Sequence, residues 1–433
     1  MSRPAGGTLL VQGGAEPPAG RPPVVGSKPI GRWLFAGVCL ASFGGPLALA
    51  AQLVPSALGD ARQRAGLVVV LGAVGFLAAL LGWLRYNQAV TSSGGLAAYA
   101  AAVGGRRLAL VQAVPWLVSY VLYVVYTPVS IVYDVLPTAV PGIRGHQTVV
   151  ELLLPAALAA LMLAGRRIAL SAIAVMAFGQ VVLLVVLAVL MLRHAAPAAA
   201  FALPRDGAGA AGLGLGVGSV SLFFVCGSLP FFLGGEVAGS HTAARRIVRT
   251  WVVGAFLFAA LGALAVVFPL TDNPAFLLDP MPGVTAARVL AGPAWGTAIG
   301  LGLAASTTAV ILVEFLAITR VGSYLSGRSP ATFARWLAVL LALAGPVSLL
   351  DPGRFYDLLE TPSLVALWVS LLVVAAALPW LGRSRKRGDF RGRSNRRTGP
   401  SKRRRVGLDV GLAVAGSAYA GYGLYLACRA IGA

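Results

Sequence analysis

Charged residues are scarce in this sequence. Only 11% of its 433 residues are Asp, Glu, Lys or Arg, whereas a soluble globular protein has about a quarter. A chain with so little charge cannot cover the surface of a soluble protein of this size. Instead, apolar stretches recur from Arg32 to the C-terminus, each long enough to cross a bilayer. The sequence therefore predicts an all-α polytopic membrane protein.

Cysteine and histidine are also rare, with three of each. Cys39, Cys226 and Cys428 lie in separate apolar segments without CxxC spacing, so neither a disulfide framework nor a zinc site is expected. The histidines fall in separate loops and share no metal-binding or triad spacing. We therefore expect no metal site, no cofactor and no catalytic residues, and the chain is not expected to be an enzyme.

Eleven membrane spans are predicted from the apolar stretches. They cover residues 33–57, 66–84, 108–134, 148–164, 168–192, 214–238, 247–270, 294–320, 333–350, 363–381 and 406–430. Most of the 35 lysines and arginines fall in alternate loops, on the side that holds the N-terminus. This distribution predicts a cytoplasmic N-terminus and an external C-terminus. The Ala-, Gly- and Arg-rich composition suggests the inner membrane of a bacterium.

The remaining segments complete the expected domain organisation. It comprises a disordered cytoplasmic tail (1–30), a five-span repeat (31–192), an extracellular linker (193–213), a second five-span repeat (214–381), a basic loop (382–405) and an eleventh span with an external C-terminus (406–433). The basic loop could bind nucleic acid or anionic lipid. The formal net charge of +21 lies largely in membrane loops of this kind. We therefore expect the loop to contact anionic lipid and no nucleic acid.

Two spans carry helix-breaking residues near the middle of the membrane. The first contains ASFGGPLAL (41–49) and the sixth contains FFVCGSLPFFLGGE (223–236). Their starts are five spans apart, so the second half of the chain enters the membrane from the opposite side. Paired breaks in two inverted halves point to the binding site of a transporter. Either break alone would suggest only a kink or close helix packing.

Three stretches resemble the amino acid–polyamine–organocation (APC) superfamily of permeases. They are YNQAVTSSGGLAAYAAAVGG (86–105), FFVCGSLPFFLGGEVAGSHTAARRIVRT (223–250) and AASTTAVILVEFLAITRVGSYLSGRSP (304–330). The resemblance covers about residues 30–381. It implies a LeuT-type fold of two inverted five-span repeats, here with one extra C-terminal span, and secondary active transport by alternating access. Pro46 at the first break and the missing acidic residue after Gly227 depart from the family pattern and leave the substrate open.

The breaks supply the predicted substrate-binding residues. Amides of Gly44 and Gly45 would hold a carboxylate, and carbonyls near Cys226 would hold an amine. The full set is Ser42, Gly44, Gly45, Pro46, Phe223, Cys226, Gly227 and Ser228. Six aromatic side chains could cover a small cavity or simply pack: Tyr120, Tyr123, Tyr126, Phe223, Phe224 and Phe231.

Residues near the breaks are candidates for ion coupling and gating. The resemblance implies that Ser306 and Thr307 could bind Na⁺, although such hydroxyls often bond their own helix instead. Glu314 could carry a proton, or it could pair with Arg320. Glu236 is expected to pair with Arg245, Arg246 or Arg85 as a gate or brace.

These observations predict a permease for an amino acid or a related small amine, with Na⁺ or H⁺ coupling. Two alternatives stay open. The same fold could carry nucleobases or another neutral solute, or the protein could be a membrane subunit or sensor that does not transport.

Overall fold

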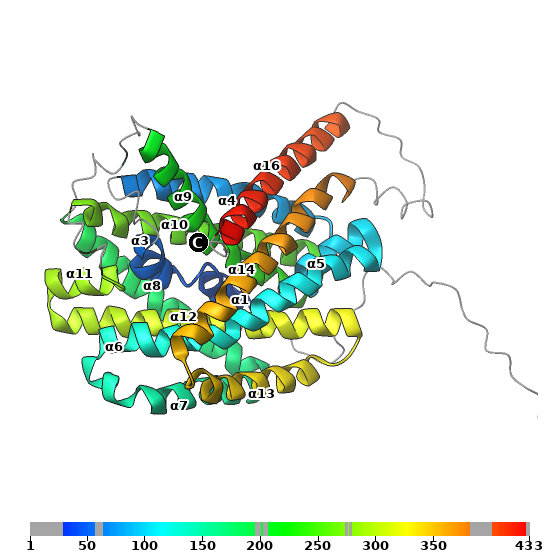
Figure 1. Cartoon of the computed structure of the whole chain (residues 1–433). Coiled ribbons are helices and arrows are strands. Elements are labelled where there is room, and N and C mark those ends of the chain that lie inside the picture. Colours follow the sequence, from blue (N-terminus) through cyan, green and yellow to red (C-terminus); the bar gives the residue numbers. More distant parts are fainter. Residues whose placement is uncertain are drawn as a thin grey trace, which may run out of the picture.

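A computed structural model describes residues 29–56, 64–194, 201, 207–272, 276, 279–381 and 401–429. In these ranges the chain is almost entirely helical (Figure 1). Within the described residues, eleven helices are long and apolar enough to cross a membrane, which agrees with the predicted number of spans. The expected N-terminal tail up to residue 28 and most of the expected basic loop, residues 382–400, lie outside the described part.

The first repeat contains spans one to five. Its elements are α1 (Arg32–Ser42), α2 (Pro46–Ala48), η1 (Leu49–Leu53) and α3 (Val54–Ser56) in span one, α4 (Ala65–Asn87) in span two, α5 (Gly95–Ser130), η3 (Ile131–Val135) and α6 (Leu136–Ala139) in span three, η4 (Pro141–His146) and α7 (Gln147–Leu163) in span four, and α8 (Arg166–Leu192) in span five.

The second repeat and the eleventh span follow. The elements are α9 (Gly207–Phe223), η6 (Val225–Phe232) and η7 (Gly234–Glu236) in span six, α10 (His241–Asp272) in span seven, the connecting helix α11 (Pro282–Ala291), α12 (Pro293–Ser326) in span eight, α13 (Pro330–Ser348) in span nine, α14 (Pro352–Ala377) and η9 (Leu378–Trp380) in span ten, and α16 (Ser401–Arg429) in span eleven.

Helix packing shows the inverted repeat directly. Span two (α4) packs against the first part of span six (α9), and span seven (α10) packs in the same way against span one (α1). Likewise α5 packs against α14, as α12 packs against α8. When each span of the first repeat is replaced by its equivalent in the second repeat, five spans later, and vice versa, each packed pair of helices maps onto the other. The chain thus has a LeuT-type five-plus-five fold, and α16 lies against α4 and α14 beside it (Figure 1).

Spans three and six begin earlier than the sequence predicted. Helix α5 starts at Gly95, with a kink at Gly104 and Gly105 that separates a short helix from the span proper. Gly105 has φ of 68°, a left-handed conformation that glycine adopts easily. Helix α9 starts at Gly207 and not at residue 214, because the Gly- and Ala-rich stretch expected to be a linker is already helical.

Two faces of the molecule are distinguished below. The proximal face is the one at which α1 begins, and the distal face is the opposite one, at which α12 and α14 begin. Between the faces the helix surfaces are apolar, as lipid contact requires. On α8, for example, Val175 and Val182 are 74% and 63% exposed.

Candidate functional site

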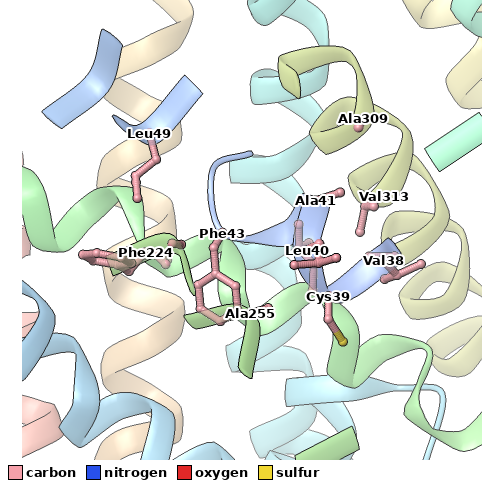
Figure 2. Packing of buried hydrophobic residues seen from close by; sticks show 14 of the residues in the cluster. Val38, Cys39, Leu40, Ala41, Phe43, Leu49, Phe224, Ala255, Ala309 and Val313 are labelled. Carbon is pink, nitrogen blue, oxygen red and sulfur yellow. The ribbon is translucent and has the colours of Figure 1, made fainter. Parts of the chain in front are cut away.

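Span one is interrupted at the residues that the sequence indicated. Helix α1 ends at Ser42 and α2 begins at Pro46. Gly44 and Gly45 between them both have φ of 67°. A side chain would strain the backbone there, so the two glycines make this interruption possible. The Phe43 side chain extends from the break towards the ribbons that carry Phe224 and Ala255 (Figure 2).

The interruption in span six lies against that of span one. Here the α-helix gives way to a tighter 3₁₀ segment, Val225–Phe232. A Cβ added to Gly227 would collide with the ring of Phe43, and one added to Gly44 would lie 3.1 Å from the carbonyl oxygen of Phe223. Two irregular segments far apart in sequence therefore meet inside the bundle. The Phe43 ring fills the space opposite Gly227.

Two backbone amides at the first break have partners within the protein. The Gly45 N–H donates to the Ala41 carbonyl oxygen at 3.1 Å, and the Ala48 N–H donates to Ser306 Oγ at 3.3 Å. The Gly45 amide is therefore not available to the expected carboxylate in this conformation.

Ser306 connects three spans. Its hydroxyl bonds to Gln180 of α8 as well as to the Ala48 amide. Thr307 Oγ1 instead donates to the Leu303 carbonyl of its own helix at 3.1 Å, which is the ordinary behaviour of a threonine in an apolar helix. Both hydroxyls that were candidates for Na⁺ thus bond to protein groups. Gln180 is a strongly polar residue inside the apolar span five, and the sequence gives no indication of its partner.

A second polar cluster lies between α5, η6 and α12. Glu314 is completely buried, and its Oε1 accepts a weak hydrogen bond from Cys226 Sγ at 3.8 Å. Among the described residues, Glu314 Oε2, the buried Tyr120 hydroxyl and Ser228 Oγ make no hydrogen bond of good geometry. Tyr120 faces Cys226 and Ser228. Buried polar atoms almost always have partners, so three unpartnered ones together indicate a place for a polar ligand.

Glu314 does not pair with Arg320, which was one of the two possibilities. Arg320 Nε instead donates to Glu236 at 2.9 Å. Arg166 also pairs with Glu236, with its Nη2 2.6 Å from Oε2. Among the described residues no cationic side chain forms an ion pair with Glu314.

The expected ion pair between Glu236 and Arg245 is not formed in the described part of the structure. Arg245 Nε donates to Thr91 Oγ1 at 2.7 Å, while Glu236 faces the start of α8 and the end of α12. The backbone beside Glu236 also holds the start of span one. The Ile30 N–H donates to the Glu236 carbonyl at 2.8 Å, and the Ala238 N–H donates to the Ile30 carbonyl at 2.9 Å. These contacts fasten spans one, five, six and eight together at the proximal face.

A cavity of about 300 Å³ lies elsewhere, between spans two, six, ten and eleven. Its lining includes Ser221, Trp368 and Tyr419. The Tyr419 hydroxyl donates to the Ser221 carbonyl at 2.8 Å. This cavity is separate from the two breaks, and its position beside α16 was not predicted.

No protein-family model and no curated protein matches the sequence. Among solved structures, the fold is similar to a Na⁺-coupled sialic acid symporter in a substrate-bound outward-open state. The TM-score is 0.53, the sequence identity is 10%, and the match covers 92% of this chain and 90% of that chain. At this identity the similarity establishes the fold and not the cargo.

Proposed function

We propose that this protein is a secondary active transporter that moves an amino acid or a related small amine across the inner membrane of a bacterium. The observation that carries the proposal is the meeting of two interrupted helices at the centre of an inverted-repeat fold. Non-helical backbone at membrane depth is tolerated where it is buried in protein or lines a cavity, and paired broken helices in inverted repeats form the substrate sites of transporters. The breaks at Gly44–Gly45 and Val225–Phe232 meet this description.

Alternating access has recognisable parts at both faces. At the proximal face, the ion pairs of Glu236 with Arg166 and Arg320 block access to the breaks between spans one, six and eight. At the distal face, α11 packs on span one so closely that a Cβ on Gly283 would collide with Ala51. The short helix at the start of α5 mirrors α11, and its Gly95 packs on Phe232 of span six. We infer that these contacts loosen alternately as the protein opens to each side.

Glu314 is the better candidate for coupling. A buried carboxyl without a cationic partner is stable when it carries a proton and costly when it is charged. Binding and release of that proton would bias the two conformations. Ser306 is already bonded to Gln180 and Ala48, so Na⁺ would have to displace both. We therefore favour H⁺ over Na⁺ as the coupling ion. We also place the N-terminus in the cytoplasm and the basic loop against anionic lipid.

One observation favours a sensor that does not transport. The Phe43 ring occupies the space opposite Gly227 where cargo would be expected. Under the transport proposal Phe43 rotates away when cargo enters. Under the sensor alternative it stays in place.

The test is uptake by purified protein in liposomes, with radiolabelled amino acids, amines and nucleobases under imposed H⁺ or Na⁺ gradients. We expect H⁺-dependent uptake of at least one amino acid or amine. Gly227→Leu should abolish it, because the new side chain collides with Phe43. Gly254→Leu is the matched control, since Gly254 has open space around it. Uptake that survives Gly227→Leu, or no uptake of any compound, would overturn the proposal.

A further inference from the structure

The cavity between spans two, six, ten and eleven opens sideways, towards the surface that faces lipid. Its volume is about 300 Å³, far more than the water-sized voids of a well-packed protein interior. Two of the residues that line it are exposed on the outside of their helices, Val74 of α4 by 58% and Tyr422 of α16 by 40%. Both lie well inside spanning helices. Hydrocarbon, and not water, therefore surrounds this opening.

The two hydroxyls in the inner wall of the cavity are already bonded within the protein. The Ser221 hydroxyl donates to the Val217 carbonyl oxygen at 2.6 Å, and the Tyr419 hydroxyl donates to the Ser221 carbonyl oxygen at 2.8 Å. The rest of the lining is glycine, alanine, valine and aromatic side chains. A buried water needs two to four polar partners, and a large cavity lined by apolar groups takes an apolar molecule instead.

The same wall supports the interrupted helices. The Tyr419 ring lies 5.2 Å from the Trp368 ring and 6.2 Å from the Phe76 ring. Phe76 in turn lies 6.1 Å from Phe43, at the first break. An empty space in the cavity would leave Tyr419 and Trp368 without van der Waals contacts on one side. A molecule in the cavity would restore those contacts and stabilise the packing behind Phe43.

One cationic side chain lies at the height of a phospholipid head group. Arg64 precedes α4 at the distal face, and its Nε is buried without a hydrogen-bond partner among the described residues. Arg64 is eleven residues before Gly75, so it lies over the same side of α4, about 16 Å nearer to the distal face. Half of the hydrocarbon thickness is about 15 Å. An acyl chain that ends in the cavity would thus have its phosphate beside this guanidinium.

We propose that the cavity binds an acyl chain of a phospholipid from the distal leaflet, with the phosphate held by Arg64. The bound chain fills the space between spans six and eleven and stabilises the packing of the eleventh span. A helix of another protein is about 10 Å wide, which a space of about 300 Å³ does not admit. The inference does not depend on the cargo or on transport.

The experiment titrates purified full-length protein in detergent with a phosphatidylcholine that carries bromine atoms in its acyl chains. Bromine quenches tryptophan fluorescence only on close approach, and Trp368 lines the cavity. The signal of Trp368 is the difference between the parent and Trp368→Phe. We expect this signal to be quenched in a saturable manner, with a single bound lipid. Exposed tryptophans such as Trp336 should instead be quenched in proportion to the total lipid.

Two variants test the two ends of the lipid. Gly75→Leu should abolish the saturable quenching, because a Cβ at Gly75 would meet Ser221 and Tyr419 at 3.6 and 3.8 Å and the longer side chain would fill the cavity. Gly411→Leu is the matched control, since Gly411 has open space around it. The lipid should raise the unfolding temperature of the parent and of this control, but not of Gly75→Leu. Arg64→Gln should raise the lipid concentration at half-saturation about tenfold.

Quenching of Trp368 without saturation, or saturable quenching that survives in Gly75→Leu, would overturn the lipid site. An unchanged half-saturation in Arg64→Gln would overturn the phosphate contact. If Gly75→Leu does not fold, the titration of the parent against Trp368→Phe decides alone. None of these results bears on uptake in liposomes, so failure of the lipid site is distinguishable from failure of the transport function.

Discussion

The ion-pair cluster at the proximal face allows a quantitative prediction. The Glu236 side chain is only 8% exposed and pairs with Arg320, which is 9% exposed, and with Arg166, which is 21% exposed. In Glu236→Gln the two arginines remain close together without their shared carboxylate. Removing one partner of a buried ion pair costs about 3–5 kcal/mol. We take the lower value, because Arg166 retains some contact with solvent.

This cost falls mainly on the conformation that is closed at the proximal face. If that face opens, both arginines gain water, so the open conformation loses little. A destabilisation of about 3 kcal/mol corresponds to a change of roughly a hundredfold in the ratio of closed to open conformations. Glu236→Gln should therefore populate the open conformation and lower the unfolding temperature.

Cys226 provides a native reporter for this change. It is partly buried at the second break, whereas Cys39 is buried and Cys428 is exposed. With Cys428 replaced by Ser, a hydrophilic maleimide should label Cys226 in detergent many times faster in Glu236→Gln than in the parent. Arg245→Gln, which removes a charge bonded only to Thr91 among the described contacts, should label at nearly the parent rate. Equal rates for Glu236→Gln and the parent would refute the idea that Glu236 closes this face.

Three further substitutions test individual contacts, each through the unfolding temperature of the purified protein. Gly45→Ala should be strongly destabilising, because it combines a left-handed backbone with a clash against Ser306, whereas Gly31→Ala should be nearly neutral since Gly31 has open space around it. Ser306→Ala should lower the free energy of unfolding by about 1–3 kcal/mol, because it leaves buried polar partners unsatisfied. Replacing Na⁺ by K⁺ should leave the unfolding temperature of the native protein unchanged. Stabilisation by Na⁺ alone would contradict our preference for H⁺ coupling. Asp409→Asn should lower the free energy of unfolding by about 3 kcal/mol, because Arg85 Nε, 2.7 Å from Asp409 Oδ1, loses its charged partner. An unchanged unfolding temperature would show that this ion pair does not stabilise the packing of the eleventh span.

Local patterns were sufficient to predict the number of spans and the two breaks. Apolar stretches of the required length define spanning helices, and the Gly-Gly-Pro sequence at residue 44 is incompatible with a continuous helix. The early start of α5 was missed because its short first helix, from Gly95 to Gly104, is too brief to register as a span. The kink at Gly104 and Gly105 separates it from the membrane helix.

Long-range partners could not be predicted in the same way. Arg245 was among the partners expected for Glu236, but the partners in the structure are Arg320 and Arg166 on other spans. Their meeting depends on how α8 and α12 cross, which local composition does not encode. The bond between Gln180 and Ser306 has the same origin.

A comparison among the buried acids gives the strongest reason to assign a function to Glu314. Asp409 has an arginine, Glu236 has two, and Glu151 accepts a hydrogen bond from Ser348. Within the described part of the chain, Glu314 has only a weak thiol donor, although it is as deeply buried as any of them. An unsatisfied buried carboxyl costs about 1–3 kcal/mol or more, and an alanine or leucine at this place in α12 would avoid that cost. Under the proposed transport function, this cost is explained by the coupling proton that binds to and leaves the Glu314 carboxyl during the working cycle.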